Sequence, residues 1–346
     1  MASFPSKQSL RSGCLTISLD FEIIWGVLDN PKLEAYKKNL EQVPTVVDRL
    51  LRLFEHQEIH ATWSTVGLLF LHSEKEFQCG LPSHRPNYTR ASLCPYRYVE
   101  EKGTLEPRLH FQPNLIRKIS ETPGQEIGSH TYSHFYCLED GSSVAAFRDD
   151  TKRAVEVASA CGCPPRSLVF PRNQCREDFL AVLTDFGIRS YRGNENHWIY
   201  EASNKSGQNL FRRALRLTDS YLNLTGHHTF GAEAIGRSAP FNLPASRFLR
   251  PYSRRLALLE PLRIRRIKSA MKHAAIHNEV FHLWWHPHNF GSNLEENIDC
   301  LQEICAEFEE LRRRYGFYSL NMAELTEEID KGTFLHTQWP ETVENL

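Results

Sequence analysis

EIGSHTYSH, at residues 126–134, joins a short strand signal to two histidines that lie four positions apart. Gly128 and Ser129 are small and leave space beside the histidines. Imidazoles at this spacing, His130 and His134, lie on one side of a turn or helical segment, close enough to share one metal ion. A two-histidine metal site needs a third protein ligand, usually a carboxylate, so we expect an acidic residue at another strand end.

That acidic residue is expected at the end of CLTISLDF (14–21), a β-branched and mostly apolar run that predicts a strand. The two-residue period of a strand aims Asp20 and Glu22 to the same side of the sheet. One of them could bind the metal while the other takes a proton from a water molecule. The histidine pair alone is more often structural, and the acidic pair is what favours a metal site.

Predicted strands alternate with predicted helices along most of the chain. Strand patterns occupy 14–21, 59–67, 126–130, 166–171, 188–193 and the start of 279–291, and helical patterns occupy 43–57, 112–121, 142–160, 177–187 and 293–316. The last predicted elements are a strand and a turn in FYSLNMAEL (317–325). This alternation indicates an α/β fold with a mostly parallel sheet, open or closed into a barrel. In such folds ligands gather at the carboxyl ends of the strands.

Two segments break the alternation. Residues 72–111 are rich in Pro, Arg and Tyr, and we expect an insertion over one end of the fold. Residues 194–278 form a second interruption, and their part 247–272 holds nine Lys or Arg against one acid, Glu260. This basic part is either a solvated helix face or an amphipathic arm that contacts an anionic membrane surface or a phosphate-bearing ligand.

Composition limits the class of protein. The 346 residues are 41% hydrophobic and 24% charged, as in an ordinary globular protein, and the net charge of −1 gives no field that would recruit nucleic acid. The N-terminal residues before the first strand hold no apolar stretch of signal-peptide length. We therefore expect a cytoplasmic protein whose nine cysteines are mostly reduced. A peripheral contact with the inner membrane face is the alternative that the basic part leaves open.

Two further strand ends carry polar residues. In LWWHPHNF (283–290), His286 follows two tryptophans and could donate a proton to a leaving amine, or it could be incidental to core packing. In VFPRNQ (169–174), Arg172 could hold a catalytic carboxylate in its ionised form, bind an anionic substrate group, or be a structural surface arginine.

Taken in order, these segments resemble the polysaccharide deacetylase family of metal-dependent carbohydrate N-deacetylases, also called the NodB-homology family. Where the family usually has TFDDG, this chain has SLDFE (18–22). The other corresponding motifs are ATWSTVG (61–67), EIGSHTYSH (126–134), FPRN (170–173) and LWWH (283–286). FPRN departs from the family's usual Arg-first order. YRGNENHW (191–198) stands where the family's Asp-Trp motif is expected.

The resemblance implies one domain, residues 1–346, with a distorted (β/α)7-type barrel. Its core would be 14–193 and 279–325, with the loop insertion at 72–111 and the basic helical insertion at 194–278.

The resemblance also implies one divalent metal, most commonly Zn²⁺, and hydrolysis of an acetamido group. His130 and His134 correspond to metal ligands, His286 to the general acid and Asp20 to the base. The family's adjacent second Asp, a ligand, is replaced here by Phe21, and Glu22 is the best substitute. Asp20 and Glu22 could also have exchanged the roles of base and metal ligand.

We therefore predict a metal-dependent hydrolase that removes an N-acyl group from a sugar, with Arg172 assisting catalysis. The substrate is expected to be a nucleotide- or lipid-linked sugar of surface polysaccharide biosynthesis. Substrate contacts are predicted for Trp25, Asn173, Trp285 and His288. The alternatives are a non-catalytic sugar-binding relative, and a C–N hydrolase that acts on a formamide or a cyclic amide.

Overall fold

Strand β1 (Cys14–Phe21) is the centre of the structure, a computed structural model that describes residues 12–204 and 209–332. All eight residues of β1 are buried. It pairs in parallel with β2 (Ala61–Thr65) on one side and with β8 (Val280–Trp285) on the other. A mostly apolar run is typical of a strand that lies inside a parallel sheet and is covered on both faces.

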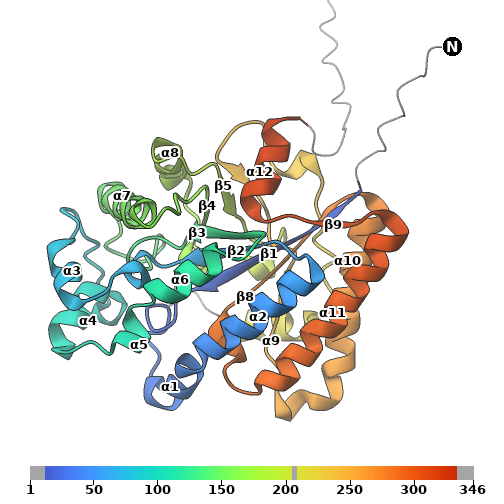
Figure 1. The fold of residues 1–346 in the computed structure, drawn as a ribbon, viewed down its shortest axis with the longest axis horizontal. Coiled ribbons are helices and arrows are strands. Elements are labelled where there is room, and N and C mark those ends of the chain that lie inside the picture. The colour runs from blue at the N-terminus through green and yellow to red at the C-terminus, as the bar shows by residue number, and fades with distance from the viewer. Residues whose placement is uncertain (1–11, 205–208, 333–346) are drawn as a thin grey trace, which may run out of the picture.

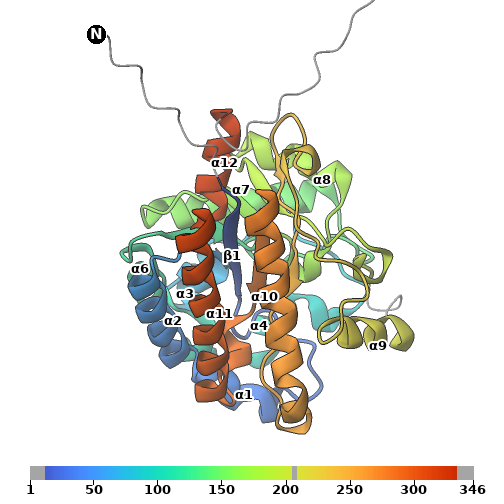
Figure 2. The ribbon, with the colours of Figure 1, turned by 90° about the vertical axis from the view of Figure 1, so that its right-hand side faces the viewer.

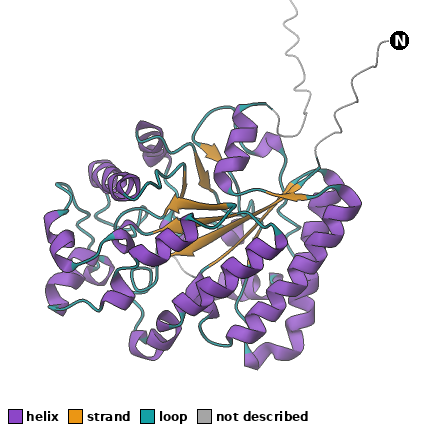
Figure 3. Cartoon of the chain, viewed as in Figure 1, coloured by secondary structure: helices purple, strands orange, loops and turns teal. Residues whose placement is uncertain are grey.

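Every pairing between the named strands is parallel, in the order β6-β5-β4-β3-β2-β1-β8-β7, with β9 beside β1. The remaining strands are β3 (Gln125–Ser129), β4 (Ser167–Val169), β5 (Ser190–Arg192), β6 (Phe241–Asn242), β7 (Arg247–Phe248) and β9 (Tyr318–Ser319). Figure 3 shows the strands gathered inside a shell of helices. This arrangement confirms the predicted α/β fold.

The sheet curls because one extended segment borders both of its ends. Residues 243–246 connect β6 to β7, so the segment passes from β5 to β8. The backbone N–H of Leu243 donates to the carbonyl of Tyr191, and the N–H of Ser246 donates to the carbonyl of His282. The result is a curled half-barrel with helices outside it, which confirms the predicted distorted barrel.

Helices cover the outer face of the sheet, and Figure 2 shows α2, α11 and α10 side by side across β1. The helices are α1 (Leu33–Glu41), α2 (Val43–Gln57), α3 (Glu74–Cys79), α4 (Pro95–Lys102), α5 (Pro107–His110), α6 (Pro113–Ser120), α7 (Val144–Ala160), α8 (Glu177–Asp185), α9 (Leu210–Asp219), α10 (Glu260–His277), α11 (Leu294–Tyr315) and α12 (Met322–Asp330). In α2, Val46, Val47, Leu50 and Phe54 recur at helical spacing and form the buried face. Among the described helices, none has the length and apolar composition needed to span a bilayer.

Two predicted segments differ in detail from the structure. Residues 72–111 contain the short helices α3, α4 and α5, which lie together at the left of Figure 1. The prediction of a final turn in 317–325 is wrong, because β9 is followed by helix α12. Asn321 and Glu324 form a reciprocal capping box that starts this helix.

Residues 194–278, which we expected to be an insertion, supply β6 and β7 to the sheet and α10 to the outer layer. Part of the positive charge of this segment is used inside the fold. Arg247 is buried against Asp219, and Arg263 is buried against Glu260.

The ion pair between Asp219 and Arg247 ties the end of α9 to β7. The Tyr200 hydroxyl also donates to Asp219, at 2.6 Å, and both charged side chains are buried. Burial acts to raise the pKa of Asp219, but the Arg247 guanidinium and the Tyr200 hydroxyl outweigh it and hold that pKa below its ordinary value. This pair therefore stabilises the fold when Asp219 is ionised.

We expect Asp219→Asn to lower the free energy of unfolding by about 3–5 kcal/mol, because Arg247 would keep a buried charge without a partner. Urea denaturation followed by circular dichroism at neutral pH measures this loss. Since the pKa of Asp219 is depressed in the fold, the stabilisation is complete above the unfolded pKa of about 3.9 and is lost as the pH falls below it. The difference between the two proteins should therefore shrink in acid.

Asp178→Asn is the control, because Asp178 pairs with Arg176 at the surface. Its loss should stay below about 1 kcal/mol. Equal losses in the two variants would contradict a structural role for the buried pair.

Candidate active site

Polar side chains from three strand ends meet at one edge of the sheet. Asp20 lies in β1 and Glu22 follows it, His130 and His134 follow β3, and His286 follows β8. All five lie in one group of contacts, because each histidine approaches one of the two carboxylates within 3.6 Å. Parallel strands explain this convergence, since their carboxyl ends share one edge.

Glu22 is the centre of the group. Its Oε2 lies 2.8 Å from Nε2 of His134 and 3.3 Å from Nε2 of His130. The ligand atoms of these three buried residues all lie within 4.8 Å of one another. Nδ1 of His130 lies 2.9 Å from the carbonyl oxygen of Val169, so Nδ1 carries the proton that it donates. The lone pair of His130 Nε2 is therefore directed toward Glu22.

The donor set of this cluster fits a divalent metal such as zinc. Ligand atoms held at about 2.0–2.1 Å from zinc in a tetrahedral site lie roughly 3.3 Å apart, close to the separations around Glu22. His130 Nε2 is buried and has no hydrogen-bond partner among the described residues. An unsatisfied buried nitrogen costs about 1–3 kcal/mol, and metal coordination would use its lone pair.

The protonation states in the cluster also suit metal binding. Burial acts to raise the pKa of Glu22, but the neighbouring His286 and His134 imidazoles outweigh it and hold that pKa well below its ordinary range. Burial lowers the pKa of His134 to about 4. At neutral pH the carboxylate is therefore ionised and the imidazole neutral, as metal ligands must be.

Asp150, on α7, holds the turn that carries the two histidines, and sequence reasoning missed it. This buried carboxylate accepts hydrogen bonds from the backbone N–H of Tyr132 at 2.7 Å and of Ser133 at 3.1 Å, and from the Ser133 hydroxyl. Thr131 and His134 have positive φ angles of 62° and 57°, which are strained for residues with side chains. Asp150 thus fixes an unfavourable backbone that aims His134 at Glu22.

Asp20 is held by Arg192 at the end of β5. The two arginine terminal nitrogens donate to the two carboxylate oxygens at 2.7 and 2.9 Å, and both side chains are buried. Burial acts to raise the pKa of Asp20, but the Arg192 guanidinium and the neighbouring histidines outweigh it and lower that pKa. The Arg192 guanidinium also lies 4.2 Å from the ring centre of Trp284.

The structure does not place Arg172 against Asp20, which was one of the roles considered for it. Arg172 instead donates to Asp29 at 2.7 Å and lies over the ring of Tyr136. Arg172 thus lines the same cavity as Asp20 without pairing with it, while Arg192 reaches Asp20 from β5. The strand predicted at 188–193 was the signal that could have identified Arg192, since a charged residue there ends a buried strand.

Asn173 and His286 complete the wall around Asp20. The side-chain oxygen of Asn173 accepts a hydrogen bond from Arg192 at 2.8 Å. Nε2 of His286 lies 3.5 Å from Oδ2 of Asp20 and 3.6 Å from Oε1 of Glu22. His286 is 23% exposed, so it can reach both the carboxylates and a bound substrate.

Trp25 and Trp285, which were predicted to contact the substrate, are not among the residues that line the cavity described below. Both indoles lie in the core, and the Nε1 of Trp25 donates to the carbonyl of His110. Because side chains alternate along β8, Trp284 rather than Trp285 lies on the same side as His286. The ring centres of Trp284 and His286 are 5.7 Å apart.

Most of the polar residues at the strand ends line a cavity of about 650 Å³. From the predicted site, Asp20, Glu22, His134, Arg172, Asn173 and His286 line it; from elsewhere, Trp284, Phe248, Glu195, Tyr200, Arg213, Arg216, Arg247 and Arg250 do. His288, predicted to contact substrate, is buried with Nε2 3.9 Å from Glu22 and is not part of the described lining. Both α9 and the residues around β7 thus contribute to the cavity wall.

The chain matches the family described as polysaccharide deacetylase over residues 29–191, which confirms the resemblance noted from its motifs. The matched range includes His130 and His134, whereas Asp20, Glu22 and His286 lie outside it. No curated protein sequence is significantly similar to the chain.

Solved structures share the fold at low sequence identity. A Mycobacterium smegmatis protein described as a polysaccharide deacetylase is 15% identical, with a TM-score of 0.58 over 96% of this chain and 94% of that one. A Pseudomonas aeruginosa PAO1 protein similarly described is 10% identical, with a TM-score of 0.53 over 93% and 91%. PuuE allantoinase is 12% identical, with a TM-score of 0.52 over 96% and 94%. At these identities the likeness shows the fold alone.

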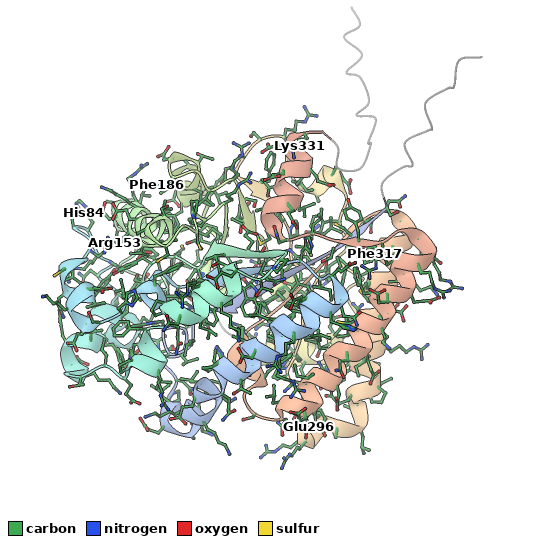
Figure 4. The ribbon with its side chains drawn as sticks, viewed as in Figure 1. His84, Arg153, Phe186, Glu296, Phe317 and Lys331 are labelled. Carbon is green, nitrogen blue, oxygen red and sulfur yellow. The ribbon has the colours of Figure 1, made fainter. Side chains whose placement is uncertain are left out.

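We expect Asp150→Ala to lower the free energy of unfolding by about 3 kcal/mol, because it leaves the buried N–H groups of Tyr132 and Ser133 without an acceptor. Zinc affinity, measured by competition with a chelating dye, should fall with it, because the turn that aims His134 loses its support. Asp149→Ala is the matched control. Asp149 is the preceding residue of α7 and bonds at the surface to His84, which Figure 4 labels at the periphery. Unchanged zinc affinity in Asp150→Ala would contradict the positioning role.

Arg192→Met should lower the free energy of unfolding by about 3–5 kcal/mol, because Asp20 would become a buried charge without a partner. Adding Asp20→Asn should recover part of this loss, since the amide carries no charge. A double-mutant cycle from urea denaturation measures the coupling. Arg172→Met, which breaks a partly exposed pair with Asp29, should cost less. A cycle that shows no coupling between Asp20 and Arg192 would rule out this pairing.

Proposed function

We propose that this chain, whose residues 29–191 match the polysaccharide deacetylases, is a metal-dependent hydrolase that removes an N-acyl group from a sugar. One observation supports the proposal most: Glu22 and His134 line one cavity with Asp20 and His286, and buried His130 completes the cluster 3.3 Å from Glu22. Ligands, a base and an acid are the groups that hydrolysis of an amide requires.

Glu22, His130 and His134 would hold the metal. A zinc ion bound there would polarise the acyl carbonyl and lower the pKa of a bound water to about 7. Assigning Glu22 as the ligand settles, within this proposal, the choice between the two carboxylates. Its Oε2 touches both histidines, whereas Asp20 is occupied by Arg192.

Asp20 acts as the general base in this proposal. The bidentate pair with Arg192 orients the carboxylate and keeps it ionised at neutral pH. The lowered pKa makes Asp20 a weak base, which would suffice for a water whose pKa a bound metal had lowered. Asp20 accepts that proton within reach of His286.

His286 acts as the general acid. Its Nε2 faces both carboxylates, while its exposed edge faces the cavity. A protonated imidazole at this position gives its proton to the departing amine, which would otherwise leave as a poor anion. The rings of Trp284 and Phe248 pack beside His286, with centres 5.7 and 5.9 Å away, and limit its rotation.

We further propose that the sugar is carried on a nucleotide or on a lipid phosphate, as in surface polysaccharide biosynthesis. The basic part 247–272 supports this, because Arg247 and Arg250 line the cavity itself. Contact with an anionic membrane surface remains part of the proposal for the lipid-linked case. Helix α9 supports it, because Leu210, which lines the cavity, is 78% exposed and its neighbour Phe211 is 62% exposed.

Zinc-loaded protein should release acetate from an N-acetylated sugar, and His130→Ala should abolish both the release and the bound zinc. The assay follows acetate enzymatically and zinc by mass spectrometry, over N-acetyl and N-formyl sugars and the cyclic amide allantoin. His286→Gln should keep the zinc but lower kcat by about 10²–10⁴-fold, because it removes only the proton donor.

His60→Gln is the control, because His60 pairs with Glu324 outside the cavity, and it should retain both zinc and activity. Robust acetate release by His130→Ala would refute the metal assignment. Stoichiometric zinc without release from any compound would favour the sugar-binding alternative.

A further inference from the structure

Some of the arginines that line the cavity form no ion pair with another described residue. Arg172 and Arg247 line it as members of ion pairs, with Asp29 and Asp219. Three others also line it, Arg213 and Arg216 from α9 and Arg250 after β7. No side-chain hydrogen bond or ion pair joins any of these three to another residue in the ranges 12–204 and 209–332. Their guanidinium groups are free to bind a ligand.

Arg216 and Arg250 are held on rigid parts of the wall. Arg216 lies one helical turn before Asp219, whose pair with Arg247 ties α9 to β7. Arg250 follows β7 by two residues, and its carbonyl accepts a hydrogen bond from Arg263. The backbone that carries the two side chains is therefore fixed before any ligand arrives, which lowers the entropic cost of binding.

Burial makes these charges unfavourable in the free protein. Arg216 and Arg250 are only partly exposed. Burial lowers the pKa of each guanidinium, and the charge of a nearby arginine lowers it further: Arg212 acts on Arg216, and Arg216 acts on Arg250. Arginine nevertheless stays protonated at neutral pH. An anion with oxygen acceptors would neutralise both charges and supply the missing hydrogen bonds.

We propose that Arg216 and Arg250 form an anion subsite that binds the phosphate group of the substrate. Two adjacent guanidinium groups match a phosphate or diphosphate, which carries at least two negative charges, better than a single carboxylate. The subsite connects to the catalytic wall through β7, because Phe248 packs against both Trp284 and His286. Binding of a phosphate at this subsite does not depend on the proposed function. Only the identification of that phosphate as part of a sugar substrate rests on the proposed function.

Titration calorimetry with inorganic diphosphate tests the subsite, on the full chain with a chelator present so that no metal binds the probe. Arg216→Gln and Arg250→Gln should each weaken diphosphate binding about tenfold or more. Arg265→Gln is the control, because Arg265 is an exposed arginine of α10 that lies outside this cavity, and it should bind like the parent. Neither arginine has a side-chain partner among the described residues, so both variants should keep the melting temperature of the parent or exceed it.

Undiminished binding in both Arg216→Gln and Arg250→Gln would overturn the subsite, as would equal weakening in Arg265→Gln. Tighter binding of glucuronate than of diphosphate would overturn the choice of phosphate. These results do not depend on acetate release, so failure of the subsite and failure of the deacetylase proposal are distinguishable.

Two further probes identify the source of the phosphate. If it belongs to a nucleotide, UDP should bind at least as tightly as diphosphate and lose affinity in Arg250→Gln. If it belongs to a lipid, the protein should co-sediment with phosphatidylcholine vesicles that contain a polyprenyl phosphate, and not with phosphatidylcholine alone. Sensitivity of either interaction to Arg250→Gln supports the subsite, and insensitivity of both contradicts it.

Discussion

The ion pair between Asp20 and Arg192 joins two strands that are not neighbours. In the sheet, β2, β3 and β4 separate β1 from β5, so the contact exists only because the sheet curls. The pair is fully buried, and Ser18 and Asn173 satisfy further donors of the guanidinium. A buried charge is tolerated only when it is paired and hydrogen-bonded, so the interior of the barrel must keep this arrangement for Asp20 to remain there. The rest of the site is built around this fixed carboxylate.

Two carboxylates that stand two residues apart acquire different chemistry from their surroundings. Asp20 faces a permanent cation, whereas Glu22 faces imidazoles. The arginine beside Asp20 orients an ionised carboxylate that can still accept a proton. The imidazoles beside Glu22 complete a set of metal ligands. Environment rather than residue type thus divides the two tasks, as the physics of buried ionisable groups requires.

Segment 194–278 contributes both to the sheet and to the wall of the cavity. Its extended part borders both ends of the sheet, and its helix α9 is tied to β7 by the buried Asp219–Arg247 pair. The same elements that complete the half-barrel therefore also present Arg216 and Arg250 to the cavity, and neither side chain pairs with another described residue. The basic composition that stood out in the sequence has two distinct uses: Arg247 and Arg263 stabilise the fold, and Arg250 faces the ligand space.

Local patterns in the sequence determined the alternating elements, the parallel sheet, and the five polar residues at the strand ends, because periodicity and strand-end position are properties of neighbouring residues. Only the tertiary structure decided which partners these residues meet. Arg192 rather than Arg172 pairs with Asp20, Asp150 supports the histidine turn, and Trp284 rather than Trp285 faces the site. The Asp20–Arg192 pair depends on how far the sheet curls, because the two residues lie 172 positions apart on strands that are not neighbours. The contact of Asp150 depends on how α7 packs against the histidine turn, and the position of Trp284 depends on which face of β8 points inward. Local sequence patterns do not determine these contacts, because each arises only when separate elements pack together.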